Sequence, residues 1–214
     1  MRIVGGKHRG RRLAAPPGDA IRPTSDRARE AVFNILAHGG FGQGGASPIP
    51  GAVVIDVFCG TGAMGLEALS RGAARAVFID NEPQSLVAAR ANIAALREQG
   101  AARVMAADAT RPPPRPRVEA PATLAFFDPP YAENIAAAAL AGFAERGWLA
   151  PGALCVVEEA ARAPALAPPP GFETLETRRY GAARVTILRY VGETGGMAQS
   201  GHEDTKARSK TQSA

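Results

Sequence analysis

Short apolar runs alternate with helix-spaced apolar positions through the middle of the chain. This alternation predicts an α/β fold with a mostly parallel sheet and helices on both faces, because each crossover between parallel strands needs a long connection. The strands predicted in this region are 52–58, 76–80, 103–106, 123–127 and 153–158, and the helices are 63–71, 84–99 and 134–146.

The last two apolar segments break this rhythm. Residues 172–180 and 184–191 are separated only by Gly181, Ala182 and Ala183, with no helical pattern between them. They are therefore predicted to pair as an antiparallel hairpin at the edge of the sheet. A sheet of this kind resembles the seven-stranded, Rossmann-like class I methyltransferase fold more than the fold of a dinucleotide dehydrogenase.

The flanking segments differ in composition from this region. Residues 1–23 predict a basic arm, a small β-ribbon that lies outside the core, and residues 24–191 predict the catalytic domain, which begins with a helix capped by Thr24 or Ser25. The polar tail 192–214 is predicted to be disordered. The Gly-rich stretch 39–51 predicts a flexible loop, and the Pro-rich stretches 111–121 and 164–170 predict surface loops.

Composition narrows the class of protein. The 214 residues are 46% hydrophobic, which is enough for one domain with its own core. No run of about 18 apolar residues is present, and the basic start lacks the apolar stretch of a signal peptide, so a cytoplasmic protein is expected. Cys59 and Cys155 lie in apolar segments without metal-ligand spacing, which predicts buried thiols and no metal site.

Positive charge is concentrated at the start of the chain. The net charge is +5, and residues 1–29 contain eight basic side chains against two acidic ones. This excess predicts contacts with the phosphates of a nucleic acid, although a solvated basic arm would have the same composition. The basic residues are Arg2, Lys7, Arg9, Arg11, Arg12, Arg22, Arg27 and Arg29.

A glycine loop between a predicted strand and a predicted helix is the first candidate binding site. Glycines at such a turn let a ligand approach backbone amides, and Asp80 lies 18 residues after Gly62, near the spacing of a ribose-binding carboxylate. Asp56 would repel a pyrophosphate but suits the ammonium and hydroxyls of S-adenosylmethionine, which makes that cofactor the prediction over NAD. The predicted cofactor contacts are Asp56, Phe58, Gly60, Gly62, Gly65, Asp80, Asn81, Asp108 and Ala109.

The string Asp128-Pro129-Pro130-Tyr131 follows another apolar strand. The lone pair of an exocyclic base amine is delocalised into the ring, so the amine is a poor nucleophile. Asp128 and a backbone carbonyl fixed by the prolines can accept hydrogen bonds from both amine protons and draw the nitrogen toward a reactive geometry. Tyr131 can stack on the extruded base. These four residues are the predicted catalytic motif.

Four segments together resemble the RsmD-type bacterial 16S ribosomal RNA (guanine-N2)-methyltransferases: 2–11, 22–36, 56–71 and 128–131. The resemblance covers about residues 1–191. It implies methyl transfer to N2 of one guanine in 16S ribosomal RNA, within the small ribosomal subunit or an assembly intermediate, by a monomer. It also implies that Arg22 and Thr24 lie near the target pocket and that Lys7, Arg9, Arg11 and Arg12 hold phosphates.

Other functions share parts of this pattern. The same amine chemistry serves adenine N6 in RNA or DNA, or less readily a protein glutamine, and no physical argument from the sequence separates guanine N2 from adenine N6. A nicotinamide-dependent oxidoreductase fits the glycine loop but not Asp56, the Asp128 motif or the terminal hairpin. A non-enzymatic RNA-binding module would not need an intact glycine loop and amine motif.

Overall fold

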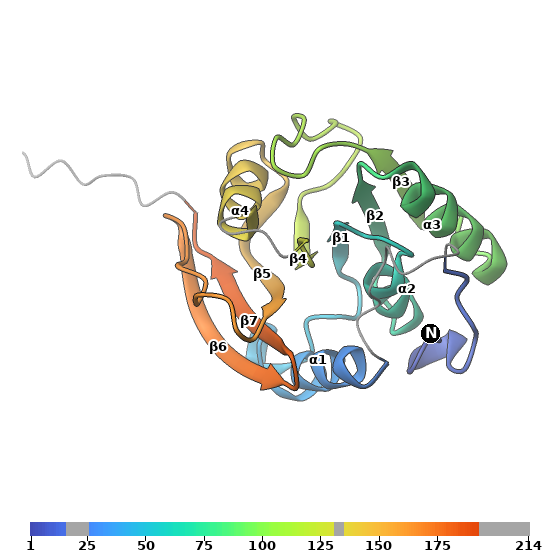
Figure 1. Ribbon diagram of the computed structural model, residues 1–214, viewed down its shortest axis with the longest axis horizontal. Helices are drawn as coiled ribbons and strands as arrows, with labels where there is room; N and C mark the ends of the chain where they lie inside the picture. Colours follow the sequence, from blue (N-terminus) through green and yellow to red (C-terminus); the bar gives the residue numbers. More distant parts are fainter. Residues whose placement is uncertain (16–25, 131–134, 193–214) are drawn as a thin grey trace, which may run out of the picture.

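The computed structural model describes residues 1–15, 26–130 and 135–192, and its centre is one seven-stranded sheet (Figure 1). The strands are β1 (Val53–Val57), β2 (Arg75–Asp80), β3 (Ala102–Ala106), β4 (Ala122–Phe127), β5 (Leu149–Ala160), β6 (Phe172–Tyr180) and β7 (Ala183–Tyr190). The helices are α1 (Asp26–His38), α2 (Ala63–Ser70), α3 (Pro83–Leu96) and α4 (Ile135–Glu145), with short 3-10 turns η1 (Gly6–His8) and η2 (Gln43–Gly45).

The strand order is β3-β2-β1-β4-β5-β7-β6. The first five strands in this order are parallel, whereas β7 pairs antiparallel with both β5 and β6. The predicted Rossmann-like class I fold and its terminal hairpin are confirmed. The hairpin pairs with β5 through its second strand, β7. As a result β6 forms the edge and β7 lies inside the sheet.

Helices cover both faces of the sheet, as predicted. On one face α1, α2 and α3 pack with the sheet into a cluster that includes Phe33 and Phe126, whose ring centroids are 5.5 Å apart. On the other face α4 packs in a cluster that includes Phe127 and Phe143, 5.7 Å apart. Phe126 and Phe127 are neighbours on β4 and enter opposite clusters because successive strand residues point to opposite faces.

The first 15 residues are part of the core. Ile3 is 0% exposed and Leu13 is 6% exposed, and both belong to the cluster under α1, α2 and α3. A bridge between Arg2 and Arg12 joins the two ends of this segment, which lies beside α2 and α3 in Figure 1. The expected ribbon is present, but the prediction that it lies outside the core is wrong, because the side chains of Ile3 and Leu13 are buried against the helices.

The long connections are tied to the elements around them. The Pro-rich segment 111–121 has no helix or strand, as predicted, yet Pro113 accepts a hydrogen bond from Trp148 Nε1 at 2.7 Å. The Gly-rich segment 39–51, predicted to be flexible, contains η2, buries Ile49 and accepts a hydrogen bond at Phe41 O from Arg189 Nη2 at 3.2 Å. Its packing fixes it more than its composition suggested.

Two sequence expectations concern the surroundings of the protein. Cys59 and Cys155 are both buried and free, as predicted. In the described ranges, no helix combines the length and apolar content that a membrane crossing needs. The predicted tail 192–214 falls, apart from Gly192, outside the described residues.

Candidate active site

Three predicted site carboxylates gather at the carboxyl edge of the sheet. Strands β1, β2 and β4 are adjacent and parallel, and Val57 is in register with both Ile79 and Phe127. Asp80 and Asp128, the residues that follow Ile79 and Phe127, therefore lie at the same edge as Asp56. Their negative charges both raise the pKa of Asp56, so the three carboxyl groups act on one another.

The glycine loop runs from the end of β1 to the start of α2. Gly62 N donates to Cys59 O at 2.7 Å, and Cys59 N donates to Ile79 O at 3.0 Å. Gly60 has φ +52° and Gly62 has φ +78°, a left-handed backbone that residues with a Cβ adopt at a cost. The predicted strand-loop-helix turn is therefore present, with Gly62 as the N-cap of α2.

Packing against Phe78 explains two of the three glycines. A Cβ on Gly65 would lie 2.4 Å from Phe78 Cε1, and a Cβ on Gly62 would lie 3.2 Å from the same ring. Phe78 is fully buried on β2. These two glycines were expected to let a ligand approach the backbone, whereas in the structure their lack of a Cβ lets α2 approach Phe78 of the sheet.

The side chain of Asp56 contacts the backbone of the first turn of α2. Its Oδ2 accepts a hydrogen bond from Gly65 N at 2.8 Å, and the residue is 3% exposed. Burial, followed by the charges of Asp128 and Asp80, raises the pKa of Asp56 to about 8. Asp56 therefore holds a proton at neutral pH unless a cation approaches it.

Stability should depend on this proton. Between pH 3.8 and about 8 the folded chain holds a proton on Asp56 that the unfolded chain has released, so the contribution of Asp56 to stability falls as pH rises through this window. Asp56→Asn removes the effect. We expect the difference in unfolding free energy, wild type minus variant, to decrease between pH 5 and pH 8 by up to about 1.4 kcal/mol per unit.

Urea unfolding of both proteins at four pH values in this range measures the difference. The exposed residue Asp108 supplies the control, because Asp108→Asn should leave the slope of the wild type unchanged from pH 5 to pH 8. Parallel stability profiles for wild type and Asp56→Asn would contradict the raised pKa.

Asp80 joins the glycine loop to the start of α3. Its Oδ2 accepts from Gly60 N at 2.9 Å and its Oδ1 accepts from Glu82 N at 2.9 Å. Each carboxylate oxygen has a second lone pair, so the group can still accept hydrogen bonds from a ligand hydroxyl. Asn81, the next residue, is exposed at the same edge.

Phe58 has a strained backbone at the entrance to the glycine loop. Its φ of +61° is one of two positive values among the described residues other than glycine, and its ring packs against the α4 face of the core. Strain of this kind costs about 1–3 kcal/mol and is common where the backbone faces a ligand. Phe58 was a predicted cofactor contact, but its positive φ could not be predicted from the sequence.

Asp108 and Ala109 follow β3. Asp108 is exposed, and its Oδ1 accepts from both the backbone N (2.9 Å) and Oγ1 (2.7 Å) of Thr110, which lowers its pKa. Ala109 is 3% exposed and packs in the core. The structure therefore gives Asp108 a turn-capping contact and leaves mainly the backbone of Ala109 for a ligand.

The amine motif directly follows β4. Asp128 N donates to Val57 O at 3.4 Å, which holds the motif against the end of β1. Asp128 is half-buried, Pro129 is buried and Pro130 is exposed. Tyr131 lies outside the described residues.

The basic residues of the arm and of the first turn of α1 fall into two groups. Lys7 Nζ pairs with Glu98 Oε1 at 2.7 Å, Arg11 Nη2 donates to Ala95 O at 3.0 Å, and Arg2 Nε lies 3.8 Å from Asp26 Oδ2. Within the described part of the chain, the exposed side chains of Arg9, Arg12 and Arg27 make no hydrogen bond or ion pair. Arg22 and Thr24 lie outside the described residues.

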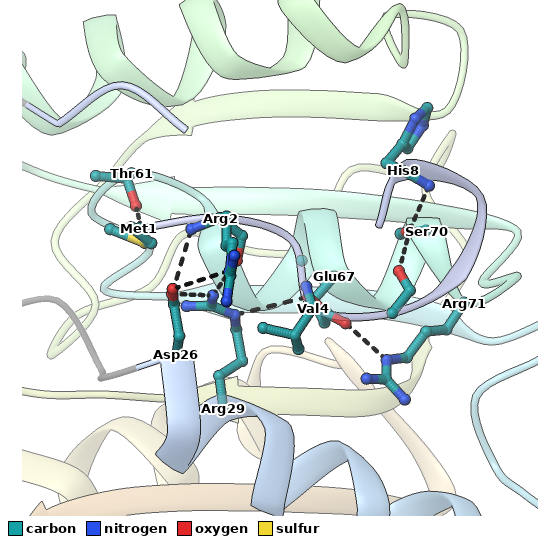
Figure 2. Close-up of polar contacts among 12 residues, drawn as sticks. Met1, Arg2, Val4, His8, Asp26, Arg29, Thr61, Glu67, Ser70 and Arg71 are labelled. Atoms are coloured by element: carbon teal, nitrogen blue, oxygen red, sulfur yellow. Dashed lines mark hydrogen bonds and ion pairs between the residues drawn. The ribbon is translucent and has the colours of Figure 1, made fainter. Parts of the chain in front are cut away.

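Two buried polar residues that hold the arm were not predicted from the sequence. Glu67 is 0% exposed on α2, and Asn92 is 2% exposed on α3; both hold the arm (Figure 2 shows the contacts of Glu67). Each is a polar residue within a mostly apolar helix, which is the signal that could have identified them. In the ranges described, no group of three or more His, Cys, Asp or Glu could hold a metal ion.

The chain is similar to known methyltransferases over nearly its whole length. A family model described as "Conserved hypothetical protein 95" matches residues 1–189. Ribosomal RNA small subunit methyltransferase D of Escherichia coli K12 is 37% identical over 158 residues, which is 74% of each chain. The solved structure of the Escherichia coli protein yhhF has a TM-score of 0.75 at 32% identity and covers 90% of this chain and 99% of its own.

A more distant structure shares the fold. An RNA methyltransferase from Salinibacter ruber, solved in complex with S-adenosyl-L-homocysteine, has a TM-score of 0.56 at 16% identity and covers 80% of this chain and 95% of its own.

Proposed function

Because this chain belongs to the RsmD-type family of ribosomal RNA methyltransferases, we propose that it transfers a methyl group from S-adenosylmethionine to the N2 amine of a guanine in 16S ribosomal RNA. The observation that carries this proposal is the meeting of the glycine loop, Asp80 and the Asp128 motif at one edge of the sheet. Ligands of open α/β sheets bind at this edge.

The charges at this edge fit the proposed cofactor. The negative charges of Asp80 and Asp128 raise the pKa of Asp56, and a bound cation would offset these charges. When bound, S-adenosylmethionine supplies a sulfonium-linked methyl group and carries a second positive charge on its ammonium. Asp80 is proposed to accept hydrogen bonds from the ribose hydroxyls, and Asp56, Phe58, Gly60, Asn81, Asp108 and Ala109 to complete the cofactor site.

Asp128 is proposed to activate the base. Its carboxylate and a carbonyl of the following proline pair accept hydrogen bonds from the two amine protons, which directs the nitrogen lone pair toward the methyl group. The nitrogen becomes cationic as the new bond forms, and the half-buried carboxylate of Asp128 stabilises that charge and is placed to receive the proton. Tyr131 is proposed to stack on the extruded base.

The arm is proposed to bind RNA phosphates through the side chains that the fold leaves available. Arg9, Arg12 and Arg27 are exposed and make no polar contact within the described ranges, whereas Lys7 and Arg11 already contact the protein. Since the contacts are with phosphates, binding should weaken steeply with salt.

Replacing both Arg9 and Arg12 by glutamine should therefore weaken RNA binding and make the negative slope of log K against log [salt] less steep by about 1 to 2, because two phosphate contacts are lost. Filter binding of unmodified 16S ribosomal RNA at several salt concentrations measures this. The matched control is the double variant of Lys7 and Arg11, which should change the slope less. Equal slopes for wild type and the Arg9/Arg12 variant would remove these arginines from the RNA interface.

The proposed reaction has a direct test. Small ribosomal subunits that lack their modifications are incubated with the protein and radiolabelled S-adenosylmethionine, and the nucleosides of the RNA are then separated. Labelled N2-methylguanosine is the expected product. Labelled N6-methyladenosine would move the target to adenine, and label in protein alone would overturn the RNA substrate. Assembly intermediates and free 16S ribosomal RNA, tested in parallel, identify the form of the substrate.

A further inference from the structure

The side chain of Asn92 joins two segments that are far apart in sequence. Its Nδ2 donates to Ala14 O and to Thr61 O, both at 2.9 Å, and its Oδ1 accepts from Ala14 N at 2.7 Å. Asn92 is 2% exposed on α3. One buried carboxamide therefore holds the end of the basic arm and the centre of the glycine loop together.

The start of the arm contacts the same loop residue. Thr61 Oγ1 lies 3.5 Å from Met1 Sδ, and Figure 2 shows these two side chains facing each other. Thr61 is 3% exposed and stands between Gly60 and Gly62, which both have positive φ values and carry no side chain of their own. The arm and Asn92 thus restrain the part of the loop with the greatest intrinsic freedom.

The arm is also anchored on the helix that follows the loop. Val4 N donates to Glu67 Oε2 at 2.8 Å, His8 N donates to Ser70 Oγ at 2.9 Å, and Ser70 Oγ donates to Gly5 O (Figure 2). Residues 1–15 consequently contact the glycine loop, α2 and α3, the elements that frame the proposed cofactor site. A movement of the arm would therefore also displace the glycine loop, α2 and α3.

We propose that Asn92 is a positioning residue that couples the binding of RNA on the arm to the binding of cofactor at the glycine loop. The inference rests on the proposed function, because it assigns RNA to the arm and the cofactor to the loop. When either ligand orders its own segment, the hydrogen bonds of Asn92 order the other, so less conformational entropy is lost in the second binding event. By linkage, the coupling factor is the same in either order of binding.

Asn92→Asp tests this with almost no change in shape. The carboxylate can still accept from Ala14 N, but it cannot donate to the carbonyls of Ala14 and Thr61. The control is Asn34→Asp, which makes the same charge change at an exposed position on α1. A second variant, Ala14→Pro, removes the Ala14 N–H at an exposed arm residue and leaves α3 intact, so the test survives if Asn92→Asp does not fold.

The first readout needs no ligand. Hydrogen exchange of the Thr61 and Gly62 amides is expected to be several-fold faster in Asn92→Asp and in Ala14→Pro than in wild type and Asn34→Asp. The second readout is the ratio of dissociation constants for unmodified 16S ribosomal RNA without and with S-adenosylhomocysteine. We expect this ratio to be about fivefold or more in wild type and Asn34→Asp, and below about twofold in the other two variants.

Two results would overturn the inference. One is loop exchange that stays at the wild-type rate in both test variants. The other is a wild-type RNA affinity that S-adenosylhomocysteine does not change. Failure of the proposed function looks different: the wild type would then make no N2-methylguanosine, while faster exchange in the variants would still support the restraint of the loop by Asn92.

Discussion

Replacing Asp128 by alanine should lower the rate of methyl transfer by about 10³-fold, because the amine then loses its charged acceptor in the transition state. The affinity for S-adenosylhomocysteine should change little, since Asp128 follows β4, whereas the glycine loop that is proposed to hold the cofactor follows β1. Single-turnover transfer to unmodified small subunits measures the rate, and calorimetry measures cofactor binding.

The matched variant Asp128→Asn separates shape from charge. Asparagine keeps one acceptor oxygen but carries no charge, so we expect a loss intermediate between wild type and Asp128→Ala. Transfer by Asp128→Ala at more than half of the wild-type rate would rule out the proposed role. A matching loss of cofactor affinity in both variants would assign Asp128 to the cofactor site instead.

Glu67→Ala should be the most destabilising of the substitutions considered, at about 3–5 kcal/mol. Glu67 Oε2 lies 3.7 Å from Arg29 Nε, and Oε1 accepts from Arg71 Nε at 2.7 Å (Figure 2). Arg29 and Glu67 are both 0% exposed, so removing the carboxylate leaves a buried guanidinium with less compensating charge. Urea unfolding of wild type and variant measures the difference in free energy.

Two controls define the source of the loss. Glu145→Ala truncates an exposed glutamate on α4 and should cost less than about 0.5 kcal/mol. Glu67→Gln keeps the acceptor for Val4 N but not the charge, so its cost reports the ionic part alone. If Glu67→Ala unfolds at the same urea concentration as Glu145→Ala, the ion pairs at Glu67 contribute nothing measurable.

The sheet could be predicted because each of its strands is specified by consecutive residues in the sequence. Runs such as Val53–Val57 and Ala122–Phe127 are mainly apolar, as strands covered on both faces must be. Asp56, Asp80 and Asp128 stand near these ends, so the edge that holds the candidate site followed from the strand pattern. The position of β7 inside the sheet also had a signal, since its centre is apolar while β6 is mostly exposed.

The anchoring of the arm had no such local signal. Ile3 and Leu13 are too few to show a periodicity, and the polar partners of His8, which are Ser70 on α2 and Glu98 just beyond α3, lie 62 and 90 residues away. The reason for Gly62 and Gly65 was likewise hidden, because the ring of Phe78 that they contact belongs to another strand. Contacts of this range depend on the completed fold, and a pattern read along one segment does not contain them.

The docked arm also fixes an order of events while the protein is being made. Ser70 and Asn92 accept hydrogen bonds from backbone amides of the arm, and Glu98 pairs with Lys7. All three residues are synthesised well after the arm. At about 5–20 residues per second, the chain needs roughly 4 to 18 seconds to extend from the arm to Glu98. Throughout that interval the arm lacks its binding surface on α2 and α3, so its burial must wait until the chain has been synthesised as far as Glu98.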